Sequence, residues 1–91
     1  MATIAVQFKI DEKRVVRGLE EARDTLDGAG PEMMLDLSAV KRIDAPGLRA
    51  LEELAARADE KAVNVVVRGA SIEMYKVLKL MKLETRFSFT S

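Results

Sequence analysis

The residues best suited to chemistry in this sequence are Asp36, Ser38 and Asp44. Asp44 could coordinate the backbone of a partner or the metal ion of a phosphoryl group, but a carboxylate beside a helix start more often stabilises that helix end. Asp36 interrupts an apolar run, and we expect it to accept hydrogen bonds from the loop that follows, because a buried carboxylate needs partners. No histidine is present to activate the hydroxyl of Ser38. We therefore interpret Ser38 as a turn residue, and Ser71 as a helix cap.

The composition removes most kinds of catalytic and metal site. The chain has no cysteine and no histidine, which excludes disulfides and thiol chemistry and removes the commonest general base and metal ligand. Its 15 basic and 15 acidic residues balance, so no electrostatic signature of a nucleic-acid-binding surface is present. The glycines at 28–30 follow a predicted helix, which is the wrong context for a phosphate-binding loop. We expect no enzyme activity, no metal and no cofactor.

Alternating strands and helices must position the candidate residues. Periodicity predicts strands at 3–10, 32–37, 63–68 and 86–90, and helices at 15–27, 46–61 and 71–82. The apolar run at 32–37 favours a central strand covered on both faces. Pro46 suits the first turn of the second helix, and Ala45 before it is pushed toward extended geometry, outside the helix. This helix starts where a buried strand ends, a place where α/β folds position functional residues.

Several of these residues match the pattern of a known family. The matching segments are Asp36-Leu37-Ser38, Ile43-Asp44 with Gly47-Leu48, and the stretch from Val77-Leu78 through Leu83 to Phe87. In this order and spacing, the chain resembles the STAS domain of bacterial anti-sigma-factor antagonists and sulfate transporters. The resemblance implies an α/β fold in a single domain over residues 1–91, with a mixed, mainly parallel sheet of about four strands covered by about three helices.

The sequence departs from this family at three places. Regulatory members carry Ser or Thr and then a phosphorylated serine before the glycine, whereas this chain has Ala45 and Pro46, neither of which has a hydroxyl. We therefore interpret these two positions as a degenerate phosphorylation site. The segment before the first helix has room for one strand, so the first strand of the family is missing. Lys82 stands where the family often carries a glycine that caps the third helix in the left-handed conformation.

The resemblance implies a non-enzymatic interaction module that docks through the start of the second helix. The implied partner-binding residues are Asp44, Ala45, Pro46, Gly47, Leu48 and Arg49, with Glu52 and Glu53 at the rim. The implied partner is an anti-sigma-factor kinase, a sensory complex, or the ATPase of a transporter such as a lipid-transport ABC system. The alternative is a nucleotide or anion ligand at the same helix end, where Pro46 removes one N–H donor.

The third helix is apolar over a wider arc than one sheet face requires. Only Glu73, Lys76, Lys79 and Lys82 are polar between residues 72 and 82. The helix could pack between the sheet and the first helix, or it could form a contact surface through which Met74, Tyr75 and Met81 make a homodimer.

The remaining sequence features concern location and surface charge. No signal peptide and no apolar stretch long enough for membrane insertion are found, so we expect a cytoplasmic protein. On the outer face of the second helix, Glu53 is expected to pair with Arg49 and Arg57.

Overall fold

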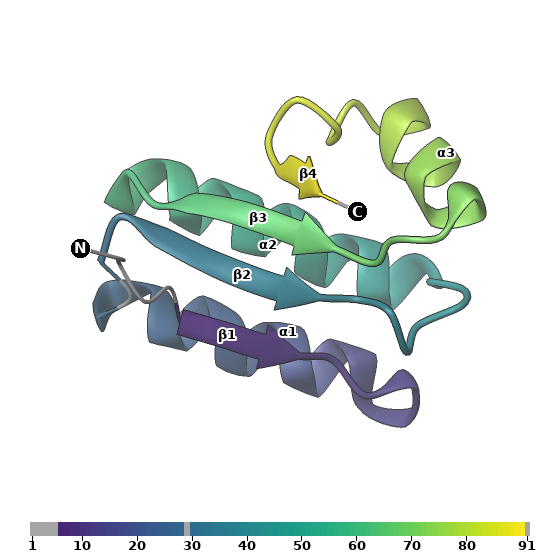
Figure 1. The fold of residues 1–91 in the computed structure, drawn as a ribbon, viewed down its shortest axis with the longest axis horizontal. Helices are drawn as coiled ribbons and strands as arrows, with labels where there is room; N and C mark the ends of the chain where they lie inside the picture. Colours follow the sequence, from purple (N-terminus) through teal and green to yellow (C-terminus); the bar gives the residue numbers. More distant parts are fainter. Residues whose placement is uncertain (1–5, 29, 91) are drawn as a thin grey trace.

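Strands and helices alternate along the computed structural model, which describes residues 6–28 and 30–90. The strands are β1 (Val6–Lys9), β2 (Glu32–Asp36), β3 (Asn64–Arg68) and β4 (Ser88–Thr90). The helices are α1 (Val15–Thr25), α2 (Ala45–Lys61) and α3 (Ile72–Leu80), with short 3₁₀ turns at Glu12–Arg14 and Leu26–Gly28 on either side of α1. The prediction of an α/β fold with about four strands and three helices is confirmed (Figure 1).

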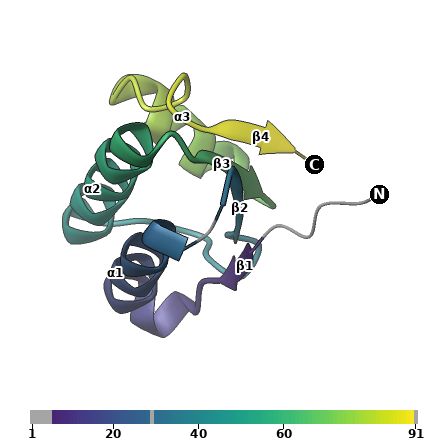
Figure 2. The ribbon, with the colours of Figure 1, turned by 90° about the vertical axis from the view of Figure 1, so that its left-hand side faces the viewer.

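The four strands lie in the order β1-β2-β3-β4, and each neighbouring pair is parallel. No antiparallel strand occurs within the described ranges, although the sequence allowed one. Because the spatial order follows the chain without reversal, right-handed crossovers place successive helices on the same side of the sheet. Figure 2 shows α1 and α2 side by side on one face.

The prediction that the central strand is covered on both faces is wrong. Met33 and Leu35 of β2 point to the helices and are completely buried. Met34 points to the opposite face, where it is only half-buried, and its neighbour in the sheet is the half-buried Val66 of β3. No helix covers this second face in the part of the chain that the structure describes (Figure 1). The apolar run of β2 therefore belongs to a strand with one buried face and one half-buried face.

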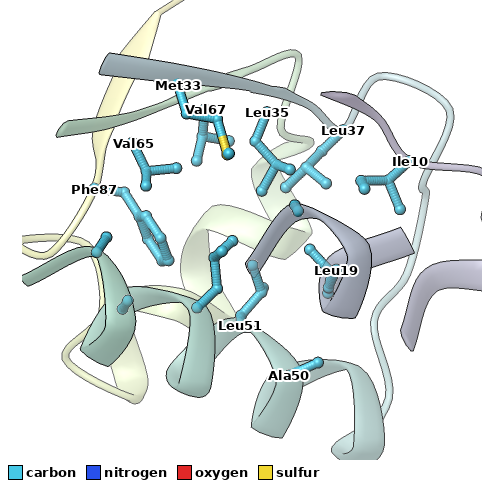
Figure 3. Close-up of a cluster of buried hydrophobic side chains, with 14 of the residues drawn as sticks. Ile10, Leu19, Met33, Leu35, Leu37, Ala50, Leu51, Val65, Val67 and Phe87 are labelled. Atoms are coloured by element: carbon cyan, nitrogen blue, oxygen red, sulfur yellow. The ribbon is translucent and has the colours of Figure 1, made fainter. Parts of the chain in front are cut away.

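The hydrophobic core lies between the covered face of the sheet and the two long helices. Figure 3 shows Leu35 of β2 and Val67 of β3 facing Leu51 of α2, with Leu19 of α1 beside them. The regular spacing of apolar residues along both helices buries one stripe of each, which is why the sequence pattern identified them correctly.

Local boundaries differ from the predictions by one to a few residues. The extended residue before α2 is Asp44, with φ −96° and ψ −179°, so Ala45 lies inside the helix instead of outside it. The last strand is an edge strand, as its alternation predicted, but it begins at Ser88 because Phe87 turns into the core. Residues 3–5 of the predicted first strand lie outside the described residues.

Helix α3 ends at Leu80, and Lys82 adopts the left-handed conformation that glycine takes most easily. Its φ is 59°. The N–H of Leu83 donates to the carbonyl of Leu78 at 2.8 Å, and the N–H of Lys82 donates to that of Lys79 at 3.0 Å. These bonds close the last turn as a glycine cap would. A lysine therefore occupies a position where its Cβ is unfavourable.

Lys82→Gly is expected to raise the free energy of unfolding by a few tenths to about 1 kcal/mol. Relief of the left-handed strain exceeds the extra freedom that glycine gives to the unfolded chain. Urea denaturation should show a higher midpoint with an unchanged slope. Lys82→Ala is the matched control, because it removes the same charge and keeps the Cβ. Equal stability of the two variants would contradict a strained cap.

Candidate functional site

The loop from residue 37 to residue 44 carries the chain from the end of β2 to the start of α2. Its beginning is fixed to the neighbouring strand, because the N–H of Leu37 donates to the carbonyl of Arg68 at 2.8 Å. Val40 is buried in the core, and its N–H donates back to Leu37 at 3.0 Å. The hydroxyl of Ser71 reaches the carbonyl of Lys41 at 3.4 Å. These contacts hold the loop from both sides and so fix where α2 begins.

Asp36 stabilises the first turn of this loop, as the sequence predicted. The N–H of Ser38 donates to its Oδ1 at 2.9 Å. Hydrogen bonds from the hydroxyl and N–H of Ser38 hold the pKa of Asp36 below its ordinary value, and the flanking charges of Lys9 and Arg68 act in the same direction. Ser38 is therefore a turn residue that donates hydrogen bonds to Asp36, in agreement with its interpretation from the sequence.

Acid is expected to remove the contribution of Asp36 to stability. A carboxyl whose pKa is lowered on folding contributes stability above its unfolded pKa, and this contribution is lost as the pH falls through the folded value. The loss should therefore occur below the ordinary pKa of 3.8. Urea denaturation of wild type and Asp36→Asn should converge as the pH is lowered from 5 to 2. A difference that stays constant over this range would contradict the assignment.

Asp44 caps the N-terminus of α2. Its Oδ1 accepts a hydrogen bond from the N–H of Gly47 at 3.1 Å, and its carbonyl accepts one from Leu48 at 2.9 Å. This geometry supports the helix-stabilising role of the carboxylate. Within residues 6–28 and 30–90, no group of three acidic side chains is arranged to hold a metal ion.

Gly47 is required by the close approach of Ile43. A Cβ at this position would lie 2.6 Å from Cγ1 of Ile43. Gly47 itself is buried, and Leu48 is half-buried against the core. Both residues were predicted to bind a partner, but in this fold they shape the start of the helix and offer little surface.

The other predicted residues at this helix end are brought together on the surface. Residues three, four and seven positions apart lie on one face of a helix, so the exposed Ala45, Pro46, Arg49 and Glu52 form one area next to the capping Asp44. We call Asp44, Ala45, Pro46, Arg49 and Glu52 the α2 start surface.

Glu53 forms a contact between α2 and α1. It accepts a hydrogen bond from Arg23 of α1 at 3.0 Å, and Arg57 approaches Asp27 at 3.7 Å. The predicted pairs of Glu53 with Arg49 and Arg57 along α2 are therefore wrong, because the packing of α1 beside α2 supplies competing partners. Glu53 is thus a weaker candidate for partner contact than Glu52.

A basic cleft borders the α2 start surface, and sequence reasoning did not find it. The cleft has a volume of about 450 Å³ and lies between the start of α1, the loop and Asp44. Its basic side chains are Lys13, Arg14, Arg17 and Arg42, and Val15, Val16 and Ile43 form its apolar part. Lys13, Arg14 and Arg17 are a local basic cluster that could have drawn attention to this place, but Arg42 joins them only through the fold.

Helix α3 divides between core and surface. Ser71 caps it as predicted, accepting a hydrogen bond from the N–H of Met74 at 3.1 Å. Met74 and Leu78 are buried, so Met74 cannot contribute to the self-association surface proposed for it. Tyr75 and Met81 are partly exposed. The wide apolar arc is therefore split: Met74 and Leu78 belong to the core, while Tyr75 and Met81 stay accessible, and the self-association surface remains a prediction for these two residues.

The comparisons with known proteins identify the family and support the fold. The family model described as "Mlab, STAS domain" matches residues 3–89. The crystal structure of TM1081 from Thermotoga maritima, provisionally described as an anti-sigma factor antagonist, aligns with a TM-score of 0.72 at 15% identity, over 93% of this chain and 73% of that chain. The NMR structure of TM1081 aligns with a TM-score of 0.74 at 13% identity, over 93% and 72% of the two chains. A comparison with curated proteins yields no match.

At these identities the likeness to TM1081 concerns the fold alone. Among the described residues, no helix combines the length and the apolar character needed to cross a bilayer.

Proposed function

Because this chain belongs to the STAS family, we propose that it is a non-enzymatic module that docks on a protein partner through the α2 start surface. One observation carries the proposal: the start of α2 is held by the Asp44 cap and by the loop contacts, while its side chains remain exposed. Asp44, Ala45 and Pro46 are all exposed. A site that is fixed by caps and loop contacts loses little entropy when a partner binds, which suits recognition.

The composition of the surface supports a protein partner over a substrate. The surface combines two short apolar side chains with the opposite charges of Arg49 and Glu52, a mixture that suits the polar rim of a protein interface.

The partner class follows from the relatives and is part of the proposal. The description of TM1081 as an anti-sigma factor antagonist favours a regulatory partner such as an anti-sigma-factor kinase or a sensory complex. The ATPase of a transporter, which the sequence resemblance also implied, is the other partner class and is compatible with the match to the Mlab STAS domain. Both kinds of partner act in the cytoplasm, where the proposal places this chain.

The basic cleft favours a second candidate function, the binding of a nucleotide or another anion. Its lining combines four cations with the carboxylates of Glu12 and Asp44 and with apolar side chains, and its volume suits a small ligand. A ligand that binds the folded state raises the melting temperature with concentration. A titration with ATP and with inorganic phosphate, followed by thermal unfolding, therefore separates this candidate from the first.

The chain is expected to resist phosphorylation at the family's usual position. Ala45 and Pro46 offer no oxygen to accept a phosphoryl group, although a phosphate at a helix start would be favoured by the free N–H groups there. After incubation with ATP and a STAS-directed kinase from the same organism, mass spectrometry should find no phosphate between residues 44 and 49.

Pro46→Ser is the matched gain-of-function variant. Its new hydroxyl lies on an exposed first turn, so the same kinase should modify it. High-stoichiometry phosphate on Ser38 or Ser71 of the wild type would contradict the absence of a switch.

A further inference from the structure

The outer face of α3 carries large apolar side chains that nothing within the described residues covers. Ile72 is 76% exposed and Leu80 is 83% exposed. Tyr75 lies on the same face at 40% exposure and is anchored by a T-shaped contact with Phe89, whose ring centroid is 5.1 Å away. Exposed apolar side chains gathered on one face of a monomer mark an interaction surface.

Two exposed lysines lie between these apolar side chains. Lys76 lies four residues from both Ile72 and Leu80, and Lys79 lies four residues from Tyr75 and seven from Ile72, so the five side chains share one face. We call these five residues the α3 patch. Further cations lie beside it, because Lys41 and Arg42 line the same surface hollow as Ile72. The exposed Glu73 also lines this hollow, so the charges beside the most exposed apolar residues are those of Lys41, Arg42, Lys76 and Lys79 against one carboxylate, and the balance is positive.

This combination of groups restricts what can cover the patch. Symmetric pairing of two α3 helices would bring the lysines of both copies together, which costs binding energy. A rigid protein would need separate hollows for Ile72 and Leu80, which lie two turns apart. The boundary of an anionic bilayer adapts to protruding apolar side chains, and lysines reach its phosphates while their stems lie along apolar groups.

We propose that the α3 patch is a peripheral contact site for an anionic lipid surface. Ile72 and Leu80 enter the headgroup region, while Lys76 and Lys79 pair with lipid phosphates. The contact does not span the bilayer, and the α3 patch shares no residue with the α2 start surface.

The direct test is co-sedimentation with lipid vesicles at low salt. Wild type should bind vesicles that contain phosphatidylglycerol and should bind pure phosphatidylcholine vesicles much more weakly. Each lysine near an anionic surface contributes about a fivefold change in partitioning, so Lys76→Gln combined with Lys79→Gln should lower binding about 25-fold. Leu80→Ser should lower it about tenfold through lost apolar contact.

A matched control is available away from α3. Lys9→Gln combined with Lys61→Gln changes the net charge equally, and both side chains are exposed, at the end of β1 and the end of α2. This double variant should bind within about threefold of wild type, because charges far from the bilayer are screened.

The fluorescence of Tyr75 gives an independent readout. The chain has one tyrosine and no tryptophan, so ultraviolet emission reports α3 alone. Quenching by aqueous succinimide should fall when anionic vesicles are added. All substitutions are at exposed positions, and circular dichroism should confirm that each variant is folded.

Three results would overturn the proposal. The first is an equal affinity of wild type for neutral and anionic vesicles, or no binding to either. The second is an equal loss of binding in the two double variants. The third is a wild-type dimer in sedimentation velocity that Leu80→Ser converts to a monomer, which would assign the patch to a second copy of the chain.

Discussion

Gly69→Ala is expected to lower the free energy of unfolding by about 2–5 kcal/mol, a large share of the stability of a small domain. Gly69 has a φ of 75°, where a Cβ is unfavourable. That Cβ would also lie 2.6 Å from Cβ and 2.9 Å from Cα of Ser38. Backbone atoms cannot move aside as a flexible side chain can. The substitution should therefore push apart the loops that follow β2 and β3.

Substitutions at two other glycines distinguish the effect of the positive φ from the effect of the clash with Ser38. Gly30 also has a positive φ, of 77°, but nothing lies within 4 Å of its added Cβ, so Gly30→Ala should cost at most about 1–2 kcal/mol. Gly28 has free space and an ordinary φ, so Gly28→Ala should stay within about 0.5 kcal/mol of wild type or be slightly stabilising.

Urea denaturation followed by circular dichroism measures all three variants on one scale. If Gly69→Ala loses no more stability than Gly30→Ala, the clash of the added Cβ with Ser38 does not contribute to the loss. The orientation of the loop that leads into α2 would then need another explanation.

The local features of the site could be predicted because neighbouring residues encode them. Asp36 stabilises the turn at Ser38 across two residues, and Asp44 and Ser71 cap helices across three. Short-range hydrogen bonds of this kind leave a clear pattern in the sequence. The order of elements was likewise readable, because each helix and strand repeats its own hydrophobic period.

The features that depend on tertiary packing could not be read in the same way. The apolar run of β2 looks the same whether one face or both faces are covered, so the open face of the sheet was missed. The apolar arc of α3 does not reveal that Met74 points inward while Ile72 points to solvent. Ion pairs such as Arg23–Glu53 join residues from different helices, and only the packing of α1 on α2 selects them over pairs within α2.

Reversing a charge on the α2 start surface is expected to weaken partner binding strongly and to leave the fold intact. Arg49 is exposed and makes no ion pair within the described residues. Arg49→Glu should change the free energy of unfolding by only a few tenths of a kcal/mol, as is usual at surface positions. A like-charge clash at an interface can cost several kcal/mol, so affinity should fall by more than about tenfold.

Lys61→Glu is the matched control for this experiment. It reverses the same charge at the opposite end of α2, where Lys61 makes only an exposed contact with Asp27 at 3.5 Å. Such pairs contribute little to stability. Glu52→Arg tests the surface a second time with the opposite change of sign, and it avoids Glu53, which is bound to Arg23.

Calorimetric titration of the partner, recovered by co-purification from the source organism, tests the proposed docking surface most directly. If the partner docks on the α2 start surface, Lys61→Glu should bind it with wild-type affinity and Arg49→Glu at least about tenfold more weakly, with both variants folded. Wild-type affinity in both Arg49→Glu and Glu52→Arg would contradict it, because the partner would then bind elsewhere on the domain.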